Sequence, residues 1–393
     1  MNQHFDVIVI GAGISGSATA YSLAKEGHSV AVIDRFAPAA MASGWTLAGV
    51  RQSGRDPVEL PLARAAVAIW ETLHEELEAP LHYTRKGNLR LARNEDEYDQ
   101  VRRMVAEQSR LGLALTFLPD NQAIRAVAPG VSTEIPGASW CPSDGHADPH
   151  ATVNAYVTAA GRRGVSFLLG QRVNSICTEG GRVTGVVTEH GRIGAACVVL
   201  TAGVLGNELL NPLGLEVPLD VQMVTVIRSV PVAPLIEPVI GVAGGDWAGR
   251  QQVDGRLRIT SGIHPWHGGM SIDTGTDGPR PVVQPRMESV GEVVAKLEQL
   301  LPGASAAPVE ALWAGLIDMT PDALPVIATA PGIDGLVVGM GFSGHGFCLG
   351  PVTGMLLADL ALGRPPRHAL DAFSFERFAA GRAGSVEPPT LHG

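Results

Sequence analysis

The sequence predicts an α/β protein whose N-terminal part is a nucleotide-binding βαβ unit of the Rossmann type. The β-branched run Phe5–Ile10 is typical of a buried parallel strand, and the glycine motif Gly11-Ala-Gly-Ile-Ser-Gly16 follows it directly. A helical stretch, Ser17–Glu26, and a second strand, Ser29–Ile33, complete the unit and lead into Asp34. At 393 residues the chain exceeds the usual single-domain length, which indicates two interleaved or consecutive domains.

Two amphipathic helices are expected after this unit. Apolar residues at helical spacing predict one helix over Leu60–Glu78 and another over Asn94–Leu111. Asn94 and Glu97 have the spacing of a capping box, in which each side chain binds a free backbone N–H group at a helix start. The second helix is therefore expected to begin at Asn94.

The second half of the chain is rich in predicted strands. These strands are expected within residues 164–200, 219–260, 308–318 and 335–338. Turns at Glu179-Gly-Gly181 and near Gly191 divide the first of these segments, and its last strand is the apolar run Cys197–Leu200. A helix is expected over about 286–301 and a final one over Gly350–Leu362, before a loose tail rich in Gly and Pro.

Composition excludes several classes of protein. The formal net charge of −10 argues against a nucleic-acid binder, because such proteins need clustered Lys and Arg. No uninterrupted apolar stretch reaches about 18 residues, so no transmembrane segment is expected. The N-terminal apolar run lacks a basic flank, which argues against a signal peptide. The four cysteines form no CxxC pair, which favours a cytoplasmic location and no metal site.

The glycines of the N-terminal motif each have a task in binding a dinucleotide. Gly11 permits the tight turn, Gly13 lets the backbone approach a pyrophosphate, and Gly16 lets helix and strand pack closely. The pyrophosphate would meet the helix N-terminus, where free N–H groups and the helix dipole favour negative charge. Asp34 would accept hydrogen bonds from ribose hydroxyls. This motif alone does not decide between FAD and NAD.

A second glycine-rich segment, Gly339–Phe347, favours FAD. It precedes the last predicted helix, and such a segment can form a second anion site. One cofactor with two anionic regions explains both sites: a pyrophosphate at the N-terminal unit and the N1/C2=O edge of a reduced flavin at the C-terminal helix. NAD does not need a returning segment of this kind. The other interpretation is a turn that is packed tightly for structural reasons.

Five motifs, in order along nearly the whole chain, resemble those of the D-amino-acid oxidase-like (DAO) flavoproteins. They are Gly11–Gly16, Ala42-Ser-Gly44, Val198–Gly203, Met319–Asp322 and Gly341–Gly346. The family includes glycine oxidase, the sarcosine oxidases, and the β subunits of bacterial amino-acid and opine dehydrogenases. The stretch from Arg51 to Arg55 is similar in particular to the β subunits of heteromeric sarcosine, hydroxyproline and opine dehydrogenases.

The resemblance implies an FAD-binding domain of the glutathione-reductase type, interleaved with a substrate domain whose mixed antiparallel sheet roofs the flavin. The FAD-binding domain would comprise residues 1–80, 150–215 and 320–375, the substrate domain 81–149 and 216–319, and the tail 376–393. The residues expected to bind FAD are Gly11, Gly13, Ile14, Ser15, Gly16, Asp34, Arg35, Ser43, Gly44, Val173, Ala202, Gly203, Gly315, Gly341, Phe342, Ser343, Gly344, His345, Gly346 and Phe347.

Two departures from monomeric sarcosine oxidase change what the resemblance implies. The cysteine that tethers FAD in that enzyme corresponds to Gly315, so non-covalent FAD is expected. The lysine that helps to bind the substrate carboxylate there corresponds to Cys348, so the substrate pocket is expected to differ. A small apolar packing role is expected for Cys348.

Four residues are candidates for catalysis or substrate binding. Arg51 matches the position at which sarcosine oxidase-like enzymes hold the substrate carboxylate, and a planar guanidinium suits that task. Arg250 is expected on a strand facing the flavin, and His264 in a loop of the same domain. His345 could donate a hydrogen bond near the flavin. For all four, a purely structural role is the alternative interpretation.

The resemblance implies FAD-dependent oxidation of an amino acid or secondary amine, by hydride transfer from the carbon next to nitrogen to flavin N5. The imine formed would then be hydrolysed. No lysine lies in the 255–270 segment, where sarcosine oxidases use one to assist oxygen, so a dehydrogenase that passes electrons to a partner subunit is expected. The alternatives are an oxygen-using oxidase, a nicotinamide-dependent dehydrogenase, and a non-enzymatic escort protein on the same fold.

Overall fold

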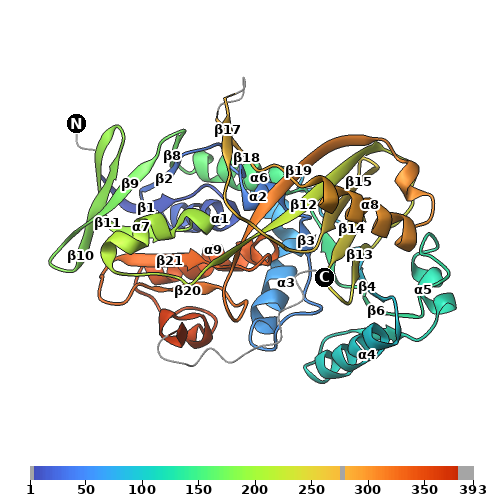
Figure 1. Ribbon diagram of the computed structural model, residues 1–393. Coiled ribbons are helices and arrows are strands. Elements are labelled where there is room, and N and C mark those ends of the chain that lie inside the picture. The colour runs from blue at the N-terminus through green and yellow to red at the C-terminus, as the bar shows by residue number, and fades with distance from the viewer. Residues whose placement is uncertain (1–3, 275–278, 379–393) are drawn as a thin grey trace.

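The computed structural model describes residues 4–274 and 279–378, and two large sheets dominate it (Figure 1). Sheet 1 has the order β20 (Val326–Thr329), β21 (Leu336–Met340), β11 (Gly191–Leu200), β1 (His4–Ile10), β2 (Val30–Asp34) and β8 (Ser166–Leu169), with β10 (Arg182–Thr188) paired to β11 and β9 (Val173–Glu179) paired to β10.

Sheet 2 lies beside sheet 1 and is mostly antiparallel (Figure 1). Its order is β16 (His264–Pro265), β12 (Asp220–Pro231), β15 (Arg256–Ser261), β14 (Trp247–Gln251), β13 (Val239–Val242), β4 (Asn88–Ala92), β6 (Gly137–Cys141) and β5 (Thr116–Leu118), with β19 (Val309–Met319) paired to β12. The pairing of β13 with β4 is parallel, so the sheet is mixed, as the resemblance implied.

Short pairs and helices complete the described chain. The pairs are β3 (Gly49–Val50) with β7 (Gly145–His146), and β17 (Ser271–Asp273) with β18 (Arg280–Val282). The helices are α1 (Ile14–Lys25), α2 (Ala42–Trp45), α3 (Leu60–Leu77), α4 (Glu95–Arg110), α5 (Asn121–Val127), α6 (Pro149–Arg162), α7 (Asn207–Leu210), α8 (Met287–Leu300) and α9 (Gly346–Ala361). No helix in the described ranges is both long and apolar enough to cross a membrane.

The parallel strands at the centre of sheet 1 end at a common edge. Ile10 is in register with Ile33 of β2 and with Leu200 of β11. The residues that come next in the chain, Gly11, Asp34 and Thr201, therefore emerge side by side. Ligands in open α/β sheets bind at this carboxyl edge, so the register of sheet 1 fixes where the site lies.

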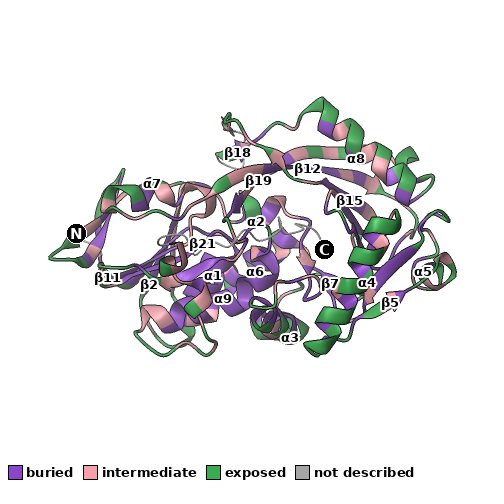
Figure 2. Cartoon of the chain, turned by 60° about the horizontal axis from the view of Figure 1, so that its bottom comes forward, coloured by how far each residue is buried: buried purple, intermediate pink, exposed green. Residues whose placement is uncertain are grey.

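Helices α1, α3, α6 and α9 cover one face of sheet 1, and Figure 2 shows α1, α6 and α9 largely buried. Helices α1 and α9 approach each other closely. A Cβ at Gly350 would collide with Ile14, and one at Gly354 would collide with Ala18. These two glycines of α9 therefore allow helix packing, which fixes the start of α9 against the start of α1.

Two predicted helix starts are wrong by about one turn. Helix α1 begins at Ile14 rather than at Ser17, because Gly13 has an extended backbone and acts as the N-cap. Helix α9 begins at Gly346 rather than at Gly350, with Pro351 inside it. The sequence favoured the later start because proline is common at the first position of a helix. With this earlier start, the free N–H groups at the beginning of α9 lie directly after Gly344 and His345.

The predicted capping of α4 is confirmed at its start and differs in its second half. Asn94 accepts a hydrogen bond from the Glu97 amide at 2.9 Å. The Glu97 carboxylate, however, accepts from the amide of Arg93 at 2.7 Å and pairs with the Arg93 side chain. Because the Glu97 carboxylate binds this guanidinium and the Arg93 amide, it does not accept from the Asn94 amide, which is the reciprocal bond of a capping box.

Sheet 1 takes its strands from 4–34, 166–200 and 326–340, and sheet 2 from 88–141, 220–265 and 309–319. The exact domain boundaries stay a prediction. Of the expected tail, residues 379–393 lie outside the described residues, whereas Arg377 is held by an ion pair to Asp322 at 2.8 Å.

Candidate functional site

Two cavities meet at the carboxyl edge of sheet 1. Residues lining the first cavity include Gly11, Asp34 and Val173, and those lining the second include Arg51 and Phe347. Seven residues line both: Gly13, Ala42, Ser43, Thr201, Gly203, Leu316 and Asp318. The cavities are therefore parts of one elongated cleft, which suits an extended ligand better than a compact one.

The glycine motif shapes the first cavity as the sequence predicted. Gly11 has φ of 108°, and a Cβ there would meet the carbonyl of Thr201. A Cβ at Gly16 would collide with the carbonyl oxygen of Gly11. The start of α1 faces the cleft, and its Ile14 amide donates to the Ser43 hydroxyl at 3.0 Å. The motif thus presents backbone N–H groups to a ligand, which is the arrangement that binds phosphate.

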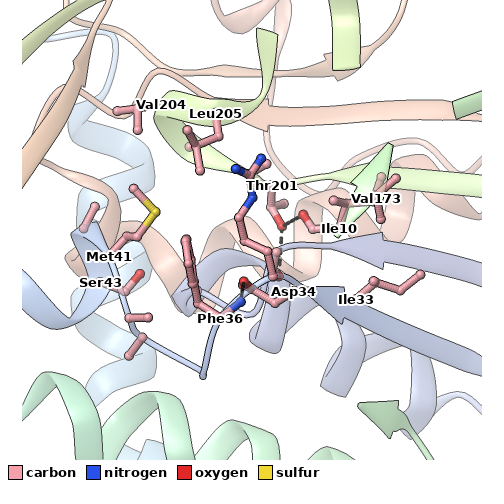
Figure 3. A pocket seen from close by; sticks show the side chains of 18 of the residues that line it. Ile10, Ile33, Asp34, Phe36, Met41, Ser43, Val173, Thr201, Val204 and Leu205 are labelled. Atoms are coloured by element: carbon pink, nitrogen blue, oxygen red, sulfur yellow. Dashed lines mark hydrogen bonds between the residues drawn. The ribbon is translucent and has the colours of Figure 1, made fainter. Parts of the chain in front are cut away.

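Asp34 lies at the end of β2 beside this loop, as Figure 3 shows. Its carboxylate accepts hydrogen bonds from the amides of Ala12 at 2.7 Å and Phe36 at 2.8 Å. Burial raises the pKa of Asp34, and these two bonds oppose that rise. Each oxygen keeps lone pairs, so Asp34 can bind ribose hydroxyls while it holds the loop in place.

Most of the expected cofactor-binding residues line the cleft, and a few lie behind it. The first cavity is lined by Gly11, Gly13, Asp34, Arg35, Ser43, Val173, Ala202 and Gly203. The second is lined by Gly13, Ile14, Ser15, Ser43, Gly203, Gly315, Phe342, Gly344, Gly346 and Phe347. The expected residues that line neither cavity are Gly16, Gly44, Gly341, Ser343 and His345.

The loop between β21 and α9 closes one side of the second cavity. Gly341, Ser343 and Gly344 have φ of 70°, 51° and 84°, so the loop turns through the left-handed region three times. Two bonds to Asp318 hold it: the Gly341 amide donates to the carboxylate at 2.8 Å, and the Ser343 amide donates to the main-chain oxygen at 3.2 Å. Of the three, Ser343 is the one residue with a side chain, so its left-handed backbone is strained. Backbone strain persists where surrounding bonds fix it, often at ligand sites.

A cluster of buried charges forms the wall of the second cavity. Arg51 and Arg55 line the cavity and are only 3% and 4% exposed. Arg55 pairs with Glu59 at 3.3 Å, whereas the Arg51 guanidinium donates to the main-chain oxygen of Ser53. Burial and the neighbouring guanidiniums lower the pKa of Arg51. Arg51 therefore carries a buried charge that no carboxylate of the described residues meets within 4 Å.

The positive charge of this cluster exceeds its negative charge. The three guanidiniums are those of Arg51, Arg55 and Arg90, and the two carboxylates are those of Glu59 and Asp144. Asp144 accepts bonds from the Gln52 and Ser53 amides, and burial raises its pKa. The excess positive charge beside the second cavity would favour an anion there over a neutral ligand.

His345 lies behind this wall rather than in the cleft. It lines a third cavity together with Arg55, Glu59 and Gln108. Its Nδ1 lies 3.0 Å from Glu59, while its buried Nε2 has no partner among the described residues. Burial lowers the pKa of His345 to about 4, so the ring is neutral at neutral pH. His345 lines neither cavity of the cleft, so a contact of its side chain with the cofactor stays a prediction.

Arg250 and His264 also lie outside the cleft. Arg250 is 1% exposed and donates to the main-chain oxygens of Leu47 and Ala147, while Nη1 lies 2.8 Å from His146 Nδ1. His264 contacts the Ser289 hydroxyl at 3.2 Å. Arg250 was expected on a strand facing the flavin and lies on β14, whereas His264 was expected in a loop and instead begins the short strand β16. Arg250 instead joins sheet 2 to the segments around β3 and β7, so its position supports a structural role.

Gly315 lines the second cavity, where a cysteine would stand in a covalent flavoenzyme. A Cβ at this position would lie 2.9 Å from Trp45. All four cysteines are free and none lines either cavity. Cys348 is buried behind the wall, where its thiol donates to the Arg51 oxygen at 3.3 Å. This agrees with its expected packing role, and no thiol is available to tether a cofactor in the cleft.

Three residues of the cleft were missed by the sequence analysis: Thr201, Arg55 and Asp318. Thr201 follows β11, and its hydroxyl donates to the Ile10 oxygen at 2.9 Å, beside the glycine motif (Figure 3). A polar residue directly after an apolar strand was the available signal. Asp318 likewise ends an apolar strand, but nothing in the sequence shows that it faces the cleft. Among the described residues no group of His, Cys, Asp and Glu could hold a metal ion.

A cleft of this shape, with a phosphate-binding helix start and a ribose acceptor, defines a dinucleotide-dependent enzyme, and its residues fit FAD along both cavities. The family model described as "FAD dependent oxidoreductase", the DAO family, matches residues 6–360. The chain therefore belongs to the DAO family of FAD-dependent oxidoreductases.

Individual relatives agree with this family. The chain is 27% identical to "Sarcosine oxidase subunit beta" of Rhizobium meliloti (strain 1021), over 99% of the chain and 93% of the relative. It is 27% identical to "Glycine oxidase" of Bacillus licheniformis, over 96% and 98%. The fold is similar to that of glycine oxidase from Geobacillus kaustophilus, with a TM-score of 0.86 at 24% identity, over 96% of this chain and 100% of that one. The expected fold, cofactor and enzyme class are confirmed.

Proposed function

We propose that this enzyme oxidises a small amino acid or secondary amine that carries a carboxylate. The observation that supports this most is the guanidinium of Arg51, buried in the wall of the second cavity without a carboxylate partner. A substrate carboxylate would neutralise the excess charge of the wall and could bind the planar guanidinium bidentately. The names of the relatives, sarcosine oxidase and glycine oxidase, point to substrates of the same kind.

The residues of the second cavity would place the substrate and exclude water. Val224 and Val226 of β12, with Thr260 of β15, line it from sheet 2. An apolar roof lowers the local dielectric, which strengthens the interaction between Arg51 and the carboxylate. FAD, when bound, would accept the hydride, and so the electron pair of the C–H bond, from the carbon next to nitrogen, which leaves an imine. The protein's part is orientation and electrostatics, so the lack of a nucleophile–base pair in the cleft fits this chemistry.

We also propose that the electron acceptor is a partner subunit or carrier rather than oxygen. The whole chain has three lysines, and each pairs with a carboxylate: Lys25 with Glu76, Lys86 with Glu237 and Lys296 with Asp246. None of them lines the cleft. In sarcosine oxidases a lysine near the flavin assists the reaction with oxygen. The relative named as a subunit is consistent with heteromeric assembly.

Two alternatives remain, an oxidase and a non-enzymatic escort protein. An oxidase would need another cation near the flavin, and among the described residues that line the second cavity only Arg51 and Arg55 could supply it. The non-enzymatic escort protein is disfavoured, because the glycine motif is intact and the chain belongs to an FAD-dependent family. A cytoplasmic location stays a prediction.

The test is anaerobic addition of amines to the purified, FAD-loaded protein. The panel would contain sarcosine, glycine, proline, hydroxyproline and an opine, each beside its carboxamide analogue as a matched control. We expect one acid to bleach the flavin absorbance and its carboxamide to do so far more slowly. A redox dye should then restore the absorbance faster than air. Equal rates for acid and carboxamide would contradict carboxylate recognition, and faster recovery in air would identify an oxidase.

A further inference from the structure

Asp318 of β19 lies where the two cavities of the cleft meet, and it is the only carboxylate among the described residues that line the second cavity. It is 7% exposed. The motif that follows it, Met319–Asp322, was recognised from the sequence, but no role was assigned to Asp318 itself. A buried carboxylate costs free energy unless bonds or a function compensate for it.

The surroundings of Asp318 leave its charge without a partner. Its carboxylate accepts the Gly341 amide, and Val221 of β12 is its partner in the strand register. Burial raises the pKa of Asp318 to about 6, and hydrogen bonds from the backbone of the Gly341–Ser343 loop oppose that rise. The largest causes of this shift are burial and these backbone hydrogen bonds. The other charged side chains that line the cleft are Arg51 and Arg55 in the second cavity and Asp34 and Arg35 in the first.

An extended cofactor that occupies both cavities has to pass this carboxylate. In FAD the part between the pyrophosphate and the flavin ring is the ribityl chain, whose hydroxyls are hydrogen-bond donors. We propose that Asp318 is a cofactor-binding residue that accepts a ribityl hydroxyl and, through its negative charge, lowers the reduction potential of bound FAD. The Gly341 amide uses one lone pair of the carboxylate, so others remain for this bond.

The proposal has a consequence for proton uptake. Two electrons added close to a buried carboxylate are repelled by it, and protonation of that carboxylate removes the repulsion. Between about pH 6 and the higher pKa that Asp318 has beside the reduced cofactor, Asp318 would therefore take one proton from solvent for every two electrons, besides the one bound by the reduced cofactor. The potential should fall with pH about twice as steeply there as it would with one proton alone. Below about pH 6 the carboxyl is already protonated, so the second proton is not needed.

The experiment compares wild type with Asp318→Asn and with a matched control, Asp220→Asn. Asp220 is the exposed carboxylate next to Val221 on the neighbouring strand, so the control removes a nearby charge outside the cleft. The midpoint potential would be measured by equilibration with reference dyes and dithionite on both sides of about pH 6. FAD affinity would be measured from the fluorescence of released cofactor.

We expect Asp318→Asn to raise the potential above about pH 6, to remove the steeper slope, and to weaken FAD binding by about tenfold or more. Asp220→Asn should match wild type. An Asp318→Asn protein with the wild-type slope and affinity would overturn the proposal. If that variant does not fold, the pH dependence of the wild-type midpoint potential still tests the proposal. A wild-type slope of one proton per two electrons at every pH measured would also overturn the proposal. Dithionite replaces the substrate, so this test stands even if the proposed substrate class is wrong.

Discussion

Replacing Arg51 with methionine should abolish recognition of the substrate carboxylate while leaving FAD in place. Methionine is apolar and of similar length, so the wall of the second cavity keeps its volume. Truncating one partner of a buried, hydrogen-bonded charge pair costs about 2–5 kcal/mol. At about 1.4 kcal/mol for each factor of ten, kcat/KM should fall by about 30-fold to about 4,000-fold. The buried position of Arg51, 3% exposed, favours the upper part of this range.

Stability should change little in this variant, in contrast to activity. Arg51 lies among guanidiniums that repel it, and the only hydrogen bond of its side chain to a described residue is to the Ser53 oxygen. Removing it relieves like-charge repulsion, which offsets the lost hydrogen bond. The assay is the rate of anaerobic flavin bleaching against substrate concentration, with the absorbance spectrum as a check that FAD is bound. A surface control, Arg182→Met, removes an exposed arginine paired with Asp334 and should behave as wild type.

The decisive comparison is between an amino acid and the amine that lacks its carboxylate. Wild type should prefer the acid strongly, and Arg51→Met should lose that preference because both substrates then meet the same apolar wall. If the variant slows both substrates by the same factor, Arg51 acts on the cofactor or on the fold, and the assignment of the carboxylate site is wrong.

Three further predictions concern the cleft and its support. Gly16→Ala should yield a protein without FAD, because the added Cβ would collide with the glycine loop. The control, Gly161→Ala, places a Cβ in open space on α6 and should keep the flavin spectrum. Arg250→Gln should lower the free energy of unfolding in urea by about 1–3 kcal/mol or more, because His146 and the main-chain oxygens of Leu47 and Ala147 lose their donor. Wild-type stability with lost turnover would restore a substrate role. Burial raises the pKa of Glu59, but the charge of His345, which is protonated only below its own pKa of about 4, the charge of Arg55 and a hydrogen bond to His345 outweigh it and bring the pKa to about 2. The stabilisation from Glu59 is therefore present above about pH 4.5 and lost as pH falls toward 2. Glu59→Gln should flatten that fall in acid unfolding curves, and an unchanged curve would contradict it.

The part of the fold that the sequence predicts best is the part that local interactions determine. The βαβ unit was predictable because strand, turn and helix are contiguous, and because Gly16 is required by its contact with Gly11 inside the same unit. The start of α9 was not predictable, since it depends on packing of Gly350 and Gly354 against α1, more than 300 residues away in the chain. Pro351 favoured a different start for a sound local reason.

In the candidate site, too, some residues could be predicted from the sequence, whereas others depend on long-range packing. Arg51 could be proposed because a resemblance fixed its position, and the structure places it in the cavity wall. Arg250 and His264 could not be placed, because the side of a strand that faces a cavity depends on register, and a shift of one residue reverses it. Asp318 was missed for a related reason. An acidic residue at the end of a strand usually faces solvent, whereas this one is buried through the pairing of β19 with β12 and through the loop after β21.

The strand β19 connects the substrate side of the cleft to the cofactor side. Its Gly315 packs against Trp45 in the second cavity, and three residues later Asp318 holds the loop that begins α9. The part of sheet 2 that lines the second cavity is thus connected to the start of α9 through the four residues from Gly315 to Asp318. A cysteine at 315 would have to displace Trp45, whose main-chain oxygen accepts from Trp313 of the same strand at 3.2 Å. A covalent tether would therefore disturb the strand that positions Asp318, so the hydrogen bonds of the cleft have to hold FAD without one.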